Sequence, residues 1–468
     1  MKCKKTLSLF LSLVMLFVIT GCGDKITGSG STNKGKKDEP VDMGGYEFVL
    51  ATAWRRDTPP RDATIFERMW HDRKSQVETD YNCSIKIKKF YANSESLTPS
   101  ILADEKVGDV VEMIPEMIYP AIGAGYLRPW DDVKDIIDFN DSRWRNSARH
   151  TVKGKHYGLS YGDADEPGTI LFYNRDVLKK AGVTEDPGQL ALDGNWTWEK
   201  FRSMLQACTM DTDNDGQKDI YGLVSCQNYS DLGFAFARSN GGYLVDIKGD
   251  KYTKGFTSPE FLEGINFLSQ LVDDDKVVKL YGSMATQDTW NDMPGGVTIY
   301  NEFRNGQVAF MSSRMWVANQ QIKPYMKGDY GMVVFPKGPK AKDYIQDGQI
   351  VGGGYTLTVT NKDYEKSAII FNALAKPLEE YEDNDAWNEL IASDFFKDGD
   401  EISMKNYKLA LDHVQGDLGY GVKNIVAGLN HIVLASVFWH ETTPAAAFEK
   451  VKDLGNDEIE STYAKILK

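Results

Sequence analysis

The sequence has few of the residues on which several protein classes depend. It contains only five cysteines among 468 residues, too few for a disulfide-rich scaffold. Its formal net charge is −14, so it lacks the positive surface that would favour nucleic acid or an anionic membrane as a partner. Its six histidines include no pair four positions apart and no H-E-x-x-H sequence, which argues against a zinc hydrolase. Aromatic residues are plentiful, which argues against disorder.

The length and composition indicate an ordinary globular protein with more than one domain. Of the 468 residues, 41% are hydrophobic and 26% are charged. A chain of this length is long enough for two or three domains, each with its own core. Three cysteines fall in the globular part, where Cys208 and Cys226 either form one disulfide or remain free thiols.

The first forty residues carry an export signal. Lys2, Lys4 and Lys5 precede an uncharged, mostly apolar run at 6–19, which is too short for an ordinary transmembrane helix. The run ends in Ile-Thr-Gly-Cys at 19–22, which resembles the lipobox of bacterial lipoproteins. The resemblance implies a signal peptide at residues 1–21, a diacylglyceryl thioether on Cys22, and a flexible tether that completes residues 22–44.

Beyond residue 45 the sequence alternates between strand-like and helix-like segments. Strand patterns occur at residues 46–52, 84–91 and 109–113, and a helical pattern lies at 64–79. The alternation returns later, with strands expected at 169–173, 308–311, 330–334 and 355–359, and helices at 175–181, 197–207, 366–374 and 444–454. Strands that alternate with helices predict an α/β fold with doubly wound sheets.

Five short stretches carry motifs in a fixed order. They are 153–159 (KGKHYGL), 172–182 (FYNRDVLKKAG), 196–201 (WTWEKF), 306–311 (GQVAFM) followed by Trp316, and 352–357 (GGGYTL). Together they resemble the family 1 extracellular solute-binding proteins of bacterial ABC importers, the maltose-binding-protein-like group. Ser160 stands where that family usually has proline.

This resemblance implies a two-lobed periplasmic-binding-protein-like fold of type II. Two doubly wound α/β lobes would be joined by crossing hinge strands, and ligand contacts made only on closure would favour the closed state. When the points at which the chain crosses between the lobes in that family are matched to this sequence, lobe 1 takes residues 45–162 plus 349–395 and lobe 2 takes residues 163–348. Helices of residues 396–468 would pack across lobe 2 and the hinge.

The resemblance also implies a function. We expect a membrane-anchored, non-enzymatic receptor that captures a carbohydrate, in particular an oligosaccharide, and delivers it to ABC transporter permease subunits. The expected location is the extracytoplasmic face of the bacterial cell membrane. Contact with the membrane would run through the lipid anchor only, no nucleic acid is expected as a partner, and the protein should be a monomer.

Candidate ligand-binding residues follow the predicted strands, where open α/β sheets bind ligands. Sugar sites combine aromatic rings, which stack on pyranose faces, with charged or amide groups that bind hydroxyls. The candidates are Trp54, Arg55 and Asp57 after the first strand, Glu116 after the strand at 109–113, Tyr229 in a loop before residues 234–237, Trp316, and Tyr355 after three glycines. The alternative for the aromatic residues is core packing, and for Arg55 and Glu116 it is an ordinary surface charge.

A candidate calcium loop lies between residues 211 and 219. Side-chain oxygens recur at alternate positions, on Asp211, Asp213, Asp215, Gln217 and Asp219, with a glycine at position 216 for a sharp turn. Carboxylates that converge on one point repel one another without a cation, so the loop predicts a structural calcium ion. It resembles a shortened calcium loop because Gly222 replaces the glutamate of an EF-hand. A solvated acidic turn is the alternative. No organic cofactor is expected.

Two other classes of function remain as alternatives. A secreted glycoside hydrolase needs two carboxylates that face each other across a cleft, whereas the adjacent Asp165 and Glu166 would point to opposite faces of a strand. The sequence GLSYG at 158–162 has the spacing of a serine-hydrolase elbow, but a strand follows it where a helix is required. The second alternative is a binding protein for a solute other than sugar.

Overall fold

The structure of the protein is a computed structural model. It describes residues 40–53, 55–58, 65–141, 143–144, 147, 150–160, 167–225, 229–248, 251–280, 296–347, 354–376, 390, 393–417, 419, 422–453 and 456–467. The predicted signal peptide, the predicted lipidation site at Cys22 and the candidate Trp54 lie outside these ranges. Within them, each helix is too short or too polar to cross a membrane.

The first lobe is built on a five-stranded sheet with the order β2-β1-β3-β14-β4. β1 pairs in parallel with β2 and β3, whereas β14 pairs antiparallel with β3 and β4. The strands are β1 (Tyr46–Thr52), β2 (Cys83–Lys89), β3 (Val110–Met113), β4 (Leu127–Arg128) and β14 (Gly354–Thr358). The other elements of this lobe are α1 (Ile65–Asp80), α2 (Ser94–Leu102), α3 (Pro115–Gly123), η1 (Trp130–Val133), β5 (Thr151–Val152), β6 (Lys155–His156) and α11 (Tyr364–Leu374).

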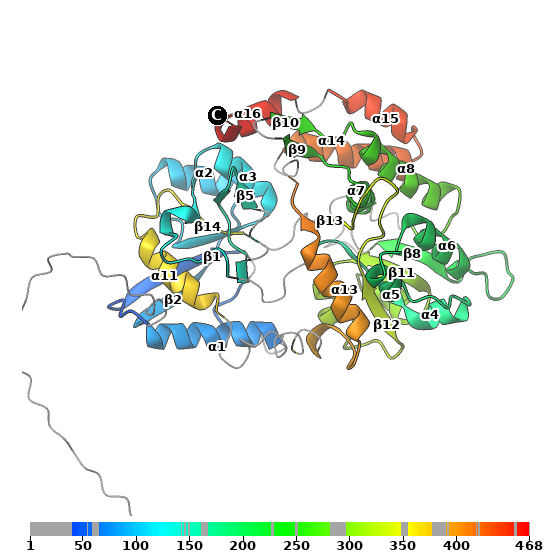
Figure 1. Ribbon diagram of the computed structural model, residues 1–468, viewed down its shortest axis with the longest axis horizontal. Coiled ribbons are helices and arrows are strands. Elements are labelled where there is room, and N and C mark those ends of the chain that lie inside the picture. The colour runs from blue at the N-terminus through cyan, green and yellow to red at the C-terminus, as the bar shows by residue number, and fades with distance from the viewer. Residues whose placement is uncertain are drawn as a thin grey trace, which may run out of the picture. The chain divides into compact units, whose positions relative to one another are not determined.

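Helices cover both faces of this first sheet (Figure 1). Successive strand residues point to opposite faces, so Leu50 joins a core formed with α1 and α11, whereas Ala51 joins a core formed with α2 and α3. In the same way, Val110 belongs to the core with Leu50, and Val111 belongs to the core with Ala51. Burial on both faces explains why these strands are almost continuously apolar, and it makes the lobe doubly wound, as predicted.

The second lobe is built on a four-stranded sheet with the order β12-β7-β11-β8. β8 and β11 are parallel, and β7 is antiparallel to both β11 and β12. The strands are β7 (Ile170–Asn174), β8 (Tyr221–Ser225), β11 (Val308–Ser313) and β12 (Tyr330–Val333). The other elements are α4 (Arg175–Lys180), α5 (Pro187–Leu192), α6 (Trp198–Cys208), α7 (Tyr229–Ser239), β9 (Val245–Lys248), β10 (Lys251–Lys254), α8 (Pro259–Asp273), α10 (Gly296–Arg304) and the π-helix η4 (Ala318–Ile322).

The C-terminal region packs mainly on the second lobe. α13 (Glu401–Asp412) lies against β12 and α5 (Figure 1), α14 (Lys423–Val433) against α7, and α15 (Pro444–Val451) against α8. The π-helix η7 (Leu434–Phe438) joins α14 to this group, and α16 (Asn456–Leu467) packs on α3 of the first lobe. A parallel pair of short strands, β13 (Gln346–Asp347) and β15 (Val414–Gln415), connects the second lobe to this region.

One arginine fastens α13 to the second lobe. The Arg175 guanidinium, at the start of α4, binds Asp400 through two nitrogens at 3.1 and 3.0 Å. Asp400 is also the N-cap of α13, where its carboxylate accepts a hydrogen bond from the backbone of Ser403. Arg175 further contacts Asp186 and Asp329, so a single side chain joins four segments of the lobe.

The elements predicted from the sequence are confirmed, with ends that shift by a few residues. The strand expected at 84–91 is β2, and the helices expected at 64–79 and 366–374 are α1 and α11. The α/β class is confirmed in both lobes. The exact lobe boundaries stay predictions. The sequence left two states possible for Cys208, a disulfide or a free thiol. The structure shows a free, buried thiol, and burial raises its pKa to about 12.

Candidate ligand-binding site

The predicted ligand residues of the first lobe gather at one edge of its sheet. β1 and β3 are parallel and end at Thr52 and Met113, and the antiparallel β14 begins at the same edge, where Gly354 pairs with Met113. We call this the carboxyl edge of the first sheet. Arg55, Glu116 and Tyr355 all lie at it, because they follow β1, follow β3 and begin β14. Ligands of open α/β sheets bind at such edges.

Arg55 is held in place on two sides. Its Nε and Nη2 each donate a hydrogen bond to the hydroxyl of Tyr355 at 3.1 Å. The guanidinium carbon lies 4.8 Å from the ring centroid of Trp70, a buried residue of α1. Burial first, and then the positive charges of Lys74 and Arg55, lower the pKa of the adjacent His71. Arg55 is therefore a positioned, permanently charged donor that suits hydroxyl, carboxylate or phosphate oxygens.

Tyr355 supports this arginine and does not offer a ring surface. Its side chain is only 3% exposed and packs with Phe371, whose ring centroid is 5.1 Å away. Its backbone bonds to Leu159 in both directions, and its carbonyl accepts a hydrogen bond from Trp130 Nε1 at 2.8 Å. The structure thus places the Tyr355 ring in the core, which was the alternative to ligand stacking. Only its hydroxyl takes part in the carboxyl edge, through the hydrogen bonds from Arg55.

Two further polar residues at this edge were missed from the sequence. Glu112 lies in β3 directly opposite Tyr355 and is 9% exposed. It accepts a hydrogen bond from the hydroxyl of Thr52, the last residue of β1, and Thr52 in turn accepts one from the backbone of Arg55. A glutamate inside an otherwise apolar strand was the signal that could have identified this residue.

The remaining candidates of the first lobe are Asp57, which lies beside the edge strand β2, Glu116, which lies in α3, and Trp54. Asp57 is exposed, and its carboxylate accepts a hydrogen bond at 3.0 Å from the backbone of Ile87 in the edge strand β2. Glu116 follows β3, as expected, and is the second residue of α3, which Pro115 begins with only Ile114 between the strand and the helix. The Glu116 side chain and Trp54 are outside the described part.

In the second lobe, Tyr229 and Trp316 also lie at the carboxyl edge of their sheet. Tyr229 follows β8 and Trp316 follows the parallel strand β11. Tyr229 was expected in a loop, which is wrong, because it is the first residue of α7. Its side chain is not described. Trp316 is partly buried against the core of this lobe and lies two residues before the π-helix η4, at the start of the same helical segment. A π-helix often marks a functional site.

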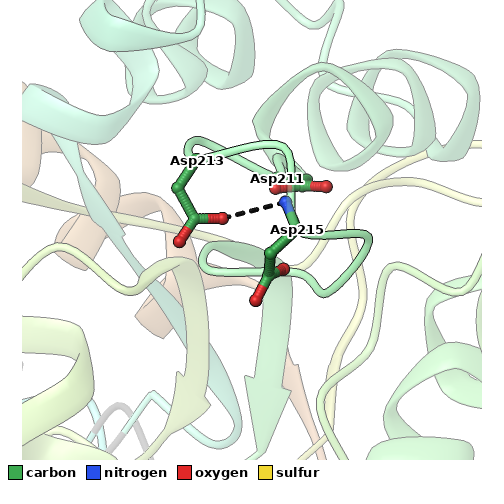
Figure 2. A group of neighbouring side chains, drawn as sticks. All are labelled: Asp211, Asp213 and Asp215. Carbon is green, nitrogen blue, oxygen red and sulfur yellow. Dashed lines mark hydrogen bonds between the residues drawn. The ribbon is translucent and has the colours of Figure 1, made fainter.

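The candidate calcium loop connects α6 to β8. Asp211, Asp213 and Asp215 each offer a carboxylate oxygen, and these oxygens lie within 4.8 Å of one another (Figure 2). Backbone groups hold the side chains, since Asp213 accepts a hydrogen bond from the backbone of Asp215 at 3.1 Å and Asp211 accepts one from that of Gly216 at 2.8 Å. Gly216 has a φ of +89°, which suits glycine at this turn.

The other two predicted ligands of this loop do not join the three aspartates. Asp219 accepts hydrogen bonds from the backbone and hydroxyl of Thr212, which lower the pKa of its carboxyl. Gln217 donates its backbone N–H to Asp215 at 2.7 Å, and its side chain is exposed. The loop precedes β8, so it lies at the amino end of that strand, opposite to Trp316. This position fits a structural ion better than one that contacts the ligand.

Comparison with known sequences connects the chain to one family. Residues 74–377 match the family described as bacterial extracellular solute-binding protein. The chain is 22% identical over 385 residues to an arabinooligosaccharide-binding protein of Bacillus subtilis, covering 81% of this chain and 77% of that protein. It is 26% identical over 293 residues to the sn-glycerol-3-phosphate-binding periplasmic protein UgpB of Escherichia coli, covering 60% of this chain and 58% of that one.

Solved structures give the same fold. The sugar-binding protein MalE of Xanthomonas citri superimposes with a TM-score of 0.64 at 16% identity, covering 90% of this chain and 98% of that one. The substrate-binding protein Lmo0181 of Listeria monocytogenes, in complex with cycloalternan, superimposes with a TM-score of 0.59 at 16% identity, covering 89% and 99%. At these identities the likeness establishes a shared two-lobed fold.

Proposed function

This chain belongs to the bacterial extracellular solute-binding protein family, and we propose that it is a receptor that captures an oligosaccharide and delivers it to an ABC transporter permease. The observation that carries the proposal is the position of its charged and aromatic residues. Arg55 and Trp316 lie at the carboxyl edges of two different sheets. A ligand that contacts both edges would favour the closed arrangement of the lobes.

The chemistry of these residues suits a sugar. Arg55 would donate hydrogen bonds to hydroxyl oxygens, and Trp316 would stack on the apolar face of a pyranose ring. The name of the Bacillus subtilis relative and the ligand of the Listeria monocytogenes structure support an oligosaccharide. A phosphorylated glycerol is the second candidate, because the Escherichia coli relative is named for sn-glycerol 3-phosphate and a guanidinium also binds phosphate.

The protein acts outside the cytoplasm, as its family does. We propose further that Cys22 carries a lipid that anchors it to the outer face of the membrane. The lipobox-like sequence before Cys22 and the polar tether after it support this proposal. Cys22→Ser should release the protein into the medium and abolish labelling by a fatty-acid analogue in cells. A Cys22→Ser protein that stays in the membrane fraction would contradict the anchor.

We propose that the loop at Asp211 binds a calcium ion with a structural role. Three carboxylates within 4.8 Å of one another support it, because their mutual repulsion is relieved by a cation. The ion would hold the connection between α6 and β8. It would take no part in sugar contact, because the loop lies at the amino end of β8.

We propose that the receptor binds its ligand without chemical change. The family and the related proteins named above are binding proteins, which supports this assignment. A glycoside hydrolase would release shorter products from an oligosaccharide. Product analysis after prolonged incubation with purified protein separates the two classes, and any shortening of the glycan would contradict the receptor.

A thermal-shift screen of residues 23–468 tests the function. The screen uses mono- and oligosaccharides, sn-glycerol 3-phosphate and glycerophosphocholine. A ligand at a hundredfold excess over its Kd stabilises the native state by about 2.7 kcal/mol. We expect one group of oligosaccharides to raise the melting temperature. Trp316→Ala should abolish that shift, whereas Trp439→Ala, at an exposed tryptophan of the C-terminal region, should keep it. A shift with the phosphates alone would overturn the sugar assignment.

A further inference from the structure

A pocket on the second lobe is lined by none of the candidate ligand residues. It has a volume of about 520 Å³ and is lined by Asn301, Arg304, Asn305, Gln321, Tyr325 and Lys327. These residues come from the end of α10, the turn that follows it, the π-helix η4 and the segment before β12. The volume is in the range of pockets that bind small molecules.

The topology of the sheet places two of the lining residues at the edge opposite to the carboxyl end of β11. β12 and β11 are both antiparallel to β7, so they run in the same direction. Asn305 comes three residues before β11 and Lys327 three residues before β12, so both lie at the amino ends of these strands. Trp316 follows the carboxyl end of β11 and begins a helical segment that continues through η4, so Trp316 and the lining residue Gln321 are five helical residues apart, about 8 Å.

Contacts of Arg304 fix the wall of the pocket. Its Nη1 donates a hydrogen bond to the carbonyl of Gln321 at 2.7 Å, and its Nη2 donates one to the side chain of Asn301. Its guanidinium carbon lies 5.0 Å from the ring centroid of Tyr325. The arginine thus ties α10 to η4 and to the aromatic ring, so the pocket is formed before any ligand binds.

The lining combines three kinds of group. Tyr325 is 65% exposed, which is unusual for an aromatic side chain, and Asn301, Asn305 and Gln321 contribute amides. Arg304 and Lys327 contribute positive charge, and the six lining residues include no carboxylate. A positively charged pocket stands out on a chain with a net charge of −14.

We propose that this pocket is a second glycan site that binds an acidic sugar, with a pyranose ring over Tyr325 and its carboxylate at Lys327 and Arg304. The amides would bind the hydroxyl groups. Such a site lets the receptor hold an acidic polysaccharide while the carboxyl edges of the two sheets stay available for the transported ligand.

Calorimetric titration of residues 23–468 with trigalacturonate at low salt tests the proposal. We expect binding that weakens as salt is added, because the attraction is between charges near the surface. Tyr325→Ala should abolish it. Lys327→Gln should weaken it about fivefold, which corresponds to about 1 kcal/mol. The uncharged maltotriose should not compete for this site. Melting temperatures of the variants confirm that they are folded.

Two matched controls make the test specific. Lys134→Gln removes the same charge from an exposed lysine of the first lobe and should leave binding unchanged. Trp316→Ala should also leave it unchanged, even if it abolishes uptake of the transported ligand. Loss of trigalacturonate binding in Trp316→Ala with retention in Tyr325→Ala would place the acidic sugar at the carboxyl edge and overturn the proposal. An equal loss in Lys134→Gln, or no binding to the wild type, would also overturn it.

Discussion

Arg55 and Tyr355 are 300 residues apart in the chain, yet two nitrogens of the arginine bind the one hydroxyl of the tyrosine, each at 3.1 Å. The contact joins the segment after β1 to the start of β14, the two points where the first sheet presents its carboxyl edge. Because the Tyr355 ring is 3% exposed, it is a rigid support. The orientation of the Arg55 guanidinium at this edge therefore depends on the hydroxyl of the buried Tyr355.

The first prediction concerns this support. Tyr355→Phe removes the acceptor but keeps the packing against Phe371, so the free energy of unfolding should fall by only about 1 kcal/mol. Ligand affinity should fall about tenfold, because Arg55 would lose its fixed direction. Calorimetry with the ligand from the thermal-shift screen measures the affinity, and urea unfolding measures the stability.

The matched control for Tyr355 is Tyr126→Phe, at a partly buried tyrosine of the same lobe. It should leave the affinity at the wild-type level. If Tyr355→Phe binds as tightly as the wild type, Arg55 does not require this support, and the carboxyl edge of the first sheet loses its proposed role in orienting the ligand.

The second prediction concerns the loop at Asp211. Asp213→Asn and Asp215→Asn keep the oxygen that accepts the backbone hydrogen bond but remove a negative charge. We expect calcium to raise the melting temperature of the wild type, and each substitution to reduce that shift strongly. Without calcium, each variant should be at least as stable as the wild type, because repulsion between carboxylates is relieved.

Asp398→Asn, at an exposed aspartate elsewhere, is the control for this loop and should respond to calcium as the wild type does. A chelator should reverse the calcium effect. If neither calcium nor the chelator changes the melting temperature of the wild type, the loop is a solvated acidic turn.

The third prediction concerns the attachment of α13. Arg175→Gln removes the two hydrogen bonds to Asp400, whose side chain is 6% exposed, and leaves that carboxylate largely buried. The free energy of unfolding should fall by about 3 kcal/mol. Lys200→Gln breaks an exposed ion pair with Glu185 and should cost less than about 1 kcal/mol. Equal losses in urea unfolding would contradict a special role for Arg175.

The fourth prediction concerns alkaline pH. Asp109 is buried and accepts hydrogen bonds from Tyr46 and from Ser367, with Lys106 at 2.8 Å. Burial first, and then the hydrogen bond to Asp109, raise the pKa of Tyr46 to about 12 from an ordinary value of 10.0. The neutral hydroxyl therefore contributes stability that is fully present below pH 10 and is lost as the pH rises through about 12.

Urea unfolding on both sides of that pH window tests the assignment. Tyr46→Phe should be less stable than the wild type at neutral pH, since Asp109 loses a donor, but it should lose less stability in the alkaline window. Tyr126→Phe should follow the wild type throughout. Parallel losses in the wild type and in Tyr46→Phe would assign the alkaline transition to other groups.

Much of the fold could be predicted because its signals are local. The pattern of apolar residues identified β1, α1 and α11 within a few residues, and it identified β7 and α4 in the same way. Local signals were weaker at the points where helices begin. Tyr229 was expected in a loop, whereas it is the first residue of α7, and Glu116 is the second residue of α3.

By itself, the sequence determined the order of strands and helices, the acidic loop at Asp211 and the family, since each depends on residues that are close in the chain. The tertiary structure alone decided which of the candidate residues come together. Insertion of β14 between β3 and β4 buries Tyr355 and brings its hydroxyl to Arg55. The direction of β11 and β12 places Asn305 and Lys327 at the edge opposite to the carboxyl end of β11, which Trp316 follows. Contacts between distant segments depend on strand order and direction, which no local pattern specifies.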